Sequence, residues 1–231
     1  MVPNAKTDED DEGTVTDTLH RVQATIAAAA QESGRNAGGI TLVAVTKTHP
    51  PARIRPLLEA GHRVFGENRV QEAQTKWPPL RREYGGVCLH LIGPLQTNKV
   101  RLAVALFDVV ETVDRPAVAE ALAHEMSQQA RWPVCLIQVN TGEEPQKAGV
   151  LPADADSFIQ ACRHDWRLPV KGLMGIPPFE DEPALHFAFL RDIALRHDLP
   201  VLSMGMSHDF ALAIHFGATH VRVGTALFGS R

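Results

Sequence analysis

Apolar residues along the chain follow two alternating patterns. Short continuous runs rich in Val, Ile and Leu are typical of strands buried on both faces, and segments with apolar residues three or four apart, such as Leu19, Val22 and Ile26, predict helices. Strands are predicted over residues 40–47, 62–68, 87–93, 106–113, 134–140, 170–176, 199–205 and 220–229. Helices are predicted over 16–33 and 70–83 and around 158–162, 185–193 and 210–214. Two more helices are predicted, one after the proline pair at 50–51 and one after Asp114, which can cap it.

This order of elements predicts one domain over residues 16–231. Strands that alternate with helices favour a parallel sheet, and eight such units favour a closed (β/α)8 barrel of the TIM type, here preceded by an extra N-terminal helix. An open doubly wound sheet is the alternative. Its dinucleotide-binding version is disfavoured because no Gly-x-Gly-x-x-Gly follows the first strand.

Charge is unevenly distributed along the 231 residues. The formal net charge is −4, and residues 1–13, with one lysine and five acidic residues, account for all of it. Residues 1–15 are therefore predicted to form a disordered acidic tail. The remainder of the chain is neutral and has no Lys/Arg block, which argues against a nucleic-acid ligand. No apolar run is as long as a membrane span, and the first residues lack the basic-then-apolar pattern of a signal peptide.

The cysteine and histidine patterns indicate a compartment and disfavour a metal. Cys88, Cys135 and Cys162 are odd in number and far apart, which is typical of reduced cysteines in a cytoplasmic protein. The eleven histidines are scattered, with no Cys-x-x-Cys or His-Glu-x-x-His pattern. We therefore expect no structural or catalytic metal.

The first strand ends on a lysine, which is the first candidate for chemistry. Lys47 closes an apolar run and is followed by two prolines that stop the strand. The carboxyl ends of parallel strands are where α/β folds place their sites, so Lys47 is a candidate for an amine that forms a Schiff base with a carbonyl. The alternative is a lysine that merely extends its ammonium to solvent.

A second candidate site lies after the last two strands. Ser207 follows a glycine break in strand seven, and Gly224 and Thr225 follow strand eight. Loops at these positions form the usual phosphate site of this barrel class, with backbone amides and hydroxyls as donors. Ordinary turn chemistry, with Ser207 as a helix N-cap, explains the same residues equally well.

Strand parity places Arg222 in the barrel lumen. Val221 and Val223 share the face that suits the helix layer, so Arg222 points inward, where it needs an acceptor or an anion. Parity does not decide the direction of Lys47, because both faces of its strand are apolar.

Six segments closely resemble the pyridoxal phosphate homeostasis proteins, the single-domain relatives of the alanine racemase barrel. They occur in one order and cover nearly everything after residue 15, which makes the resemblance specific although each segment alone is weak. The segments are AVTKT (44–48), FGEN (65–68), HLIGPLQTNK (90–99), GLMGIP (172–177), SMGMS (203–207) and VRVGTALFG (221–229).

The resemblance implies pyridoxal 5′-phosphate (PLP) as cofactor and assigns residues to it. Lys47 matches the lysine that carries PLP as a Schiff base, and Arg222 matches the arginine that faces the pyridine nitrogen. The phosphate-binding positions correspond to Ser207, Gly224 and Thr225, and residues that line the cofactor correspond to Asn68, Met174 and Ser203.

The assigned residues and the resemblance together predict a function. An arginine at the ring nitrogen disfavours ring protonation and carbanion chemistry, and racemases of the related fold also need a tyrosine from a second domain. The only tyrosine here is Tyr84, expected on the surface. We expect a cytoplasmic, monomeric PLP-homeostasis protein with little or no catalysis, which passes PLP to apo-enzymes. The alternatives are a PLP-dependent amino-acid racemase, a Schiff-base aldolase acting on a sugar phosphate, and an interaction protein with a structural Lys47.

Overall fold

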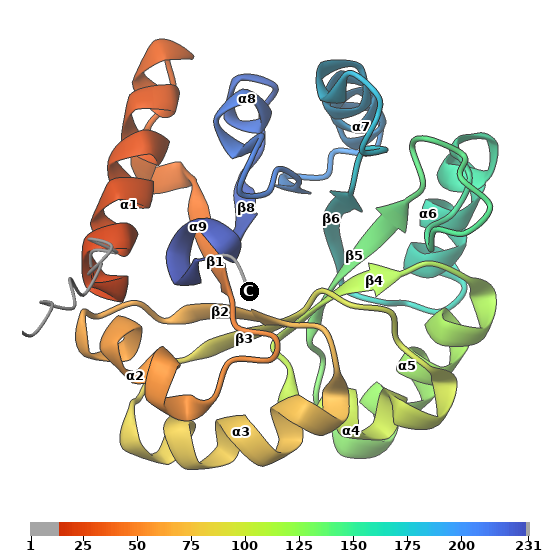
Figure 1. The fold of residues 1–231 in the computed structure, drawn as a ribbon. Helices are drawn as coiled ribbons and strands as arrows, with labels where there is room; N and C mark the ends of the chain where they lie inside the picture. Colours follow the sequence, from red (N-terminus) through yellow and green to blue (C-terminus); the bar gives the residue numbers. More distant parts are fainter. Residues whose placement is uncertain (1–13, 230–231) are drawn as a thin grey trace, which may run out of the picture.

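The computed structural model describes residues 14–229, and these form one closed parallel barrel whose neighbouring strands follow chain order, with β8 paired to β1. The predicted (β/α)8 barrel with an extra N-terminal helix is confirmed, and Figure 1 shows the strands inside a ring of helices. The strands are β1 (Thr41–Val45), β2 (Val64–Glu67), β3 (Cys88–Leu91), β4 (Val109–Val113), β5 (Val134–Val139), β6 (Val170–Gly175), β7 (Val201–Ser203) and β8 (His220–Val223).

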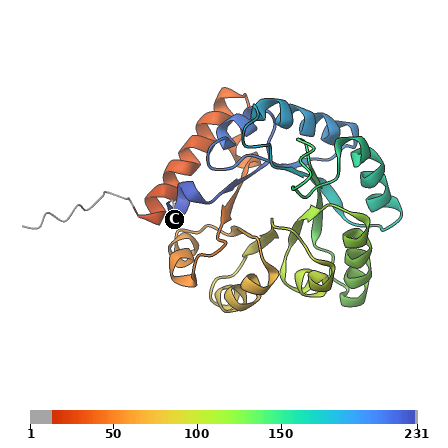
Figure 2. The same cartoon turned by 45° about the vertical axis from the view of Figure 1, so that its right-hand side comes forward.

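Helices connect successive strands on the outside of the barrel, as the turned view in Figure 2 shows. None of the helices within residues 14–229 is long and apolar enough to cross a membrane. The α-helices are α1 (Val15–Glu32), α2 (Pro51–Glu59), α3 (Val70–Glu83), α4 (Val100–Leu106), α5 (Pro116–Gln129), α6 (Ala155–His164), α7 (Pro183–Arg196), α8 (Phe210–His215) and α9 (Thr225–Phe228); short 3-10 turns are η1 (Ala37–Gly39), η2 (Thr97–Lys99) and η3 (Pro152–Asp154).

The leading helix α1 begins one residue earlier than predicted, because Thr14 caps it. The Thr14 hydroxyl accepts from the Asp17 amide and the Asp17 carboxylate accepts from the Thr14 amide, which is a capping box. The Thr18 hydroxyl donates to the carbonyl of Leu227 at 2.8 Å and joins α1 to α9. The predicted acidic tail falls almost entirely on residues 1–13, which lie outside the described residues.

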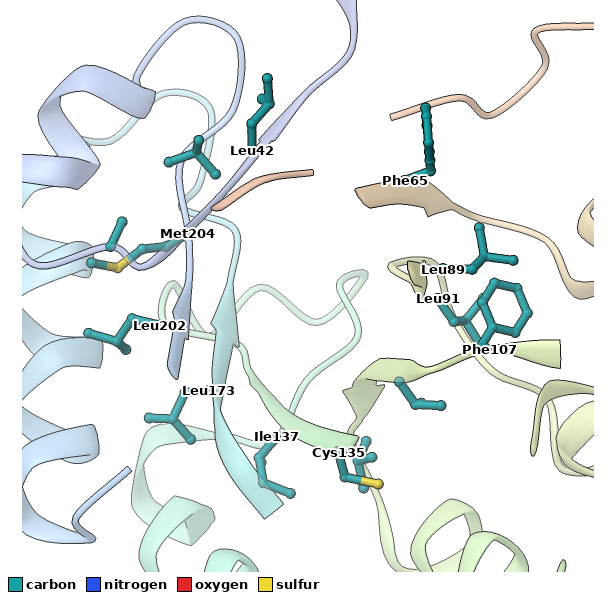
Figure 3. Packing of buried hydrophobic residues seen from close by; sticks show 14 of the residues in the cluster. Leu42, Phe65, Leu89, Leu91, Phe107, Cys135, Ile137, Leu173, Leu202 and Met204 are labelled. Carbon is teal, nitrogen blue, oxygen red and sulfur yellow. The ribbon is translucent and has the colours of Figure 1, made fainter. Parts of the chain in front are cut away.

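The main core lies between the barrel and its helices. Leu42, Phe65, Leu89, Ile137 and Leu202 are among its buried residues, and Figure 3 shows them leaving the strands toward the surrounding helices. Alternate strand residues point the other way into the lumen, as the period of two requires.

Two elements differ from the sequence prediction. Strand eight was predicted over 220–229, but β8 ends at Val223 and residues 225–228 form the helical turn α9. The apolar run hides this break, because period alone does not separate a strand from a short helix. Helix α4 was not predicted; it occupies seven residues between β3 and β4.

Candidate functional site

A cavity of about 510 Å³ opens at the carboxyl ends of the strands. It is lined by residues at or directly after the ends of β1, β2, β3, β6, β7 and β8, which lie far apart in the sequence. Of the eight residues assigned from the sequence, six line it: Lys47, Asn68, Ser207, Arg222, Gly224 and Thr225. The other two, Met174 and Ser203, are fully buried in strands β6 and β7 and do not line the cavity.

Lys47 lies in the turn directly after β1 and is half-buried. Lys47 and Val45 line the same cavity, which settles the parity that the sequence left open. Within residues 14–229 no hydrogen bond or ion pair engages the Lys47 ammonium. The amine is therefore available to an electrophile in the cavity.

Hydrogen-bond donors gather around the Ser207 hydroxyl at one end of the cavity. Its Oγ accepts from the amides of Gly224 and Ala226, both at 3.3 Å, and from the Thr225 hydroxyl at 3.2 Å. Ser207 is not the N-cap that turn chemistry suggested, because Asp209 occupies that position of α8. Two amides and two hydroxyls at one place suit the oxygens of a phosphate.

Gly205 allows the loop that carries Ser207 to turn sharply. Its φ is +87°, and a Cβ here would lie 2.5 Å from Ala213 Cβ and 2.9 Å from Phe210 Cα. The carbonyl of Gly205 accepts from the Arg222 amide at 3.0 Å. The loop after β7 is thus tied to β8, next to the donors described above.

Arg222 points into the lumen, as strand parity predicted, and is 4% exposed. Its Nη1 donates to Ser203 Oγ at 2.6 Å and its Nη2 donates to the carbonyl of Gly175 at 2.9 Å. The Glu111 carboxylate lies 3.9 Å from Nη1 and partly balances the guanidinium charge. Burial lowers the pKa of Arg222, but a guanidinium keeps its proton at any ordinary pH.

A buried ionic pair below Arg222 escaped the sequence analysis. Glu111 Oε1 and His90 Nδ1 are 2.6 Å apart, and Glu111 Oε2 accepts from the Ser203 hydroxyl at 2.6 Å. Burial opposes charge on His90, yet hydrogen bonds with Cys88 and Glu111 raise its pKa to about 9. For Glu111 burial likewise opposes the charge, but His90 and Arg222 outweigh it and the pKa is lowered. The signal in the sequence was a charged residue inside each of two apolar strands.

Asn68 follows β2 and faces the cavity where its backbone meets the next loop. A Cβ on Gly93 would lie 2.3 Å from the Asn68 carbonyl oxygen, so glycine permits this close approach. Met174 is paired in register with Ser203 and fills the lumen beside it. Met174 and Ser203 form the layer beneath the cavity. Arg222 donates to Ser203 in that layer and also lines the cavity itself.

Further residues that the sequence analysis did not assign also line the cavity. His49 stacks on Phe228 with ring centroids 4.2 Å apart, and His208 lies on the rim after β7. The apolar lining comes from Val45, Ile92, Ile176 and Met206. Tyr84 is remote: it ends α3, and its hydroxyl contacts Glu59 at 3.3 Å.

Comparison with known proteins assigns the family. The model of the alanine racemase N-terminal domain matches residues 18–231. The pyridoxal phosphate homeostasis proteins of Escherichia coli K12 and Pseudomonas aeruginosa are 40% and 42% identical to this chain; the matches cover 92% and 94% of it and 95% and 96% of those proteins. This chain belongs to the pyridoxal phosphate homeostasis protein family.

Solved structures agree with this family. PipY of Synechococcus elongatus PCC7942 with PLP bound superimposes with a TM-score of 0.76 at 37% identity, covering 88% of this chain and all of PipY. An alanine racemase of Clostridium difficile 630 superimposes with a TM-score of 0.73 at 14% identity, over 94% of this chain and 57% of the racemase. That second likeness shows the shared barrel alone.

Proposed function

We propose that this chain binds PLP in the 510 Å³ cavity and holds it as a Schiff base on Lys47. The observation that carries the proposal is that three kinds of group meet in one cavity: the Lys47 amine, the Arg222 guanidinium and the donors around Ser207. Membership of the homeostasis family and the PLP bound to PipY support it.

The donor set fits the parts of this cofactor. The amides of Gly224 and Ala226 and the hydroxyls of Ser207 and Thr225 suit the phosphate, which carries two negative charges. Asn68 lines the cavity from the β2 loop. From the layer beneath, Ser203 holds the Arg222 guanidinium and Met174 fills the lumen.

The chemistry expected of Lys47 is reversible. Bound PLP would supply an aldehyde, and the Lys47 amine is the group that would condense with it, releasing one water in a reaction that hydrolysis reverses. Arg222, which the family resemblance assigns to the ring nitrogen, disfavours a proton there because like charges repel. The ring is then a weak electron sink, which suits holding the cofactor rather than transforming an amino acid with it.

The biological role that we infer is PLP homeostasis with little or no catalysis. The only tyrosine, Tyr84, directly follows α3, and its hydroxyl donates a hydrogen bond to Glu59. Tyr84 does not line the cavity, so the second base that a racemase takes from tyrosine is missing. A monomer that releases PLP to apo-enzymes in the cytoplasm is the form we propose. The buried Cys135 and Cys162, free like Cys88, fit a reducing compartment.

Titration of the purified protein with PLP tests this function. We expect a visible absorbance band that saturates at one PLP per chain, with no turnover of amino acids. An aldolase acting on a sugar phosphate would give no such band. His49 and His208 line the cavity, and an imidazole is a competent base, so racemisation is the alternative that the assay must exclude. Turnover of any amino acid at about 1 s⁻¹ or faster would contradict the proposal.

A further inference from the structure

The turn that carries Lys47 has an unusual backbone. The turn of residues 46–49 lies between β1 and α2, and Thr48 in it adopts φ +65° although its side chain is β-branched. A left-handed conformation is uncommon for such a residue and persists only where the surroundings hold it. The position of the Lys47 amine depends on whatever holds this turn.

The Lys76 side chain on α3 donates hydrogen bonds to the backbone of this turn. It is 6% exposed, and its Nζ donates to the carbonyl of Thr46 at 2.8 Å and to the carbonyl of His49 at 3.2 Å. These carbonyls lie on either side of Lys47 in the chain. A buried ammonium is costly unless it is paired, so this arrangement must be compensated by nearby acids.

Two carboxylates complete the arrangement, and both also hold the turn. Glu72 Oε1 lies 2.8 Å from Lys76 Nζ and accepts from the Thr48 amide at 2.6 Å. Glu67 Oε1 lies 2.7 Å from Lys76 Nζ and accepts from the Thr46 hydroxyl at 2.6 Å. Backbone groups before and after Lys47 are therefore held by Lys76 and Glu72, which are one helical turn apart on α3. Glu67 at the end of β2 holds the Thr46 side chain instead.

The ionisation of the carboxylates agrees with this geometry. Burial works against the charge of Glu72, but hydrogen bonds from Lys76 and the Thr48 amide outweigh it and lower its pKa. Burial raises the pKa of Glu67, and Lys76 opposes that rise only in part. Glu72 is accordingly the firmly charged partner that bonds both the turn and the lysine.

We propose that Lys76 and Glu72 are positioning residues, which hold the residue 46–49 turn so that the Lys47 amine stands ready to form the Schiff base. This inference rests on the proposed function. Neither residue lines the cavity. They act through the backbone on either side of Lys47, whose own amine they leave free.

The sharpest variant is Glu72→Ala. The Glu72 side chain is 28% exposed, and in its absence Lys76 retains Glu67 and two carbonyls, so the chain should still fold. Glu72→Gln keeps an amide oxygen to accept from Thr48 and should rescue the turn in part. The matched control is Glu83→Ala, an exposed glutamate of the same helix that pairs with Arg55.

Two ligands separate positioning from binding. The rate of Schiff-base formation is followed by stopped-flow absorbance with PLP, and non-covalent affinity is measured with pyridoxine 5′-phosphate, which has an alcohol in place of the aldehyde. We expect Glu72→Ala to slow formation by roughly tenfold or more, because small misplacements of a reacting group are costly. Affinity for pyridoxine 5′-phosphate should stay within about twofold of wild type, and Glu83→Ala should change neither.

A ligand-free measurement gives a second readout. The Thr48 amide should exchange with deuterium faster in Glu72→Ala than in Glu72→Gln or in wild type, since its acceptor is gone. Wild-type rates in Glu72→Ala, or an equal loss for both ligands, would overturn the positioning role. If wild type itself forms no Schiff base on Lys47, the proposed function fails instead, and the two failures are thereby distinguished.

Discussion

The Ser203 hydroxyl joins Arg222 to Glu111. It accepts from Arg222 Nη1 at 2.6 Å and donates to Glu111 Oε2 at 2.6 Å, whereas the guanidinium and the carboxylate themselves are 3.9 Å apart. One small side chain thus mediates between two buried charges. Its removal leaves both with an unsatisfied site, which is the costly case for a buried polar group.

Ser203→Ala should therefore lower the stability of the fold, while PLP still binds in the cavity. We expect the free energy of unfolding to fall by about 1–3 kcal/mol, measured by urea denaturation. The absorbance of bound PLP should shift as well, because the Arg222 guanidinium loses one of its two fixed contacts. Ser157→Ala, at an exposed serine of α6, is the control. Equal stability of the two variants would contradict the role given to Ser203.

Stability should also depend on pH through His90. Its pKa is raised to about 9 in the folded chain from 6.5, so the folded chain holds a proton that the unfolded chain loses between these values. The stabilisation is complete below pH 6.5 and is lost as the pH rises toward 9, by on the order of 1–3 kcal/mol. Urea denaturation at several pH values measures it.

His90→Gln should flatten this alkaline decline, since glutamine does not titrate. His124→Gln, at an exposed histidine of α5, should leave the decline as in wild type. An unchanged alkaline slope in His90→Gln would show that His90 is not the group that titrates.

The sequence located the site through two rules that need no long-range information. Strand period placed Arg222 in the lumen, and the rule that barrel sites lie at carboxyl strand ends singled out Lys47. Which residues touch across the barrel depends on strand register and closure instead. Two sets of contacts therefore appear only in the structure: the hydrogen bonds of Glu111 with His90 and Ser203, and the hydrogen bonds of Lys76 with the turn that carries Lys47.

Ser207→Ala should weaken phosphate binding selectively. The hydroxyl is the centre on which the amides of Gly224 and Ala226 and the Thr225 hydroxyl converge. Affinity for PLP should fall roughly tenfold, or about 1.4 kcal/mol, while affinity for pyridoxal, which has no phosphate, should hardly change. Fluorescence or absorbance titration with both ligands measures this. A parallel loss for both would place the phosphate elsewhere.

Gly205→Ala tests the tight turn that presents Ser207. A methyl group at φ +87° would lie 2.5 Å from Ala213 Cβ, so strain and collision add. We expect a loss of about 2–4 kcal/mol of unfolding free energy. Gly86→Ala is the matched control, because Gly86 also has a positive φ, +78°, but nothing within 4 Å. Its cost should be nearer 1 kcal/mol, from backbone strain alone.

Lys47 is the residue on which we propose that PLP is carried. The most direct measurement is borohydride reduction of the PLP-loaded protein, followed by mass mapping of the modified peptide, with Lys47→Ala alongside. We predict that the visible band disappears on reduction, that the adduct maps to Lys47, and that the folded Lys47→Ala protein gives neither band nor adduct. An adduct on Lys99 or Lys171, or a Lys47→Ala protein that keeps the band, would contradict the assignment.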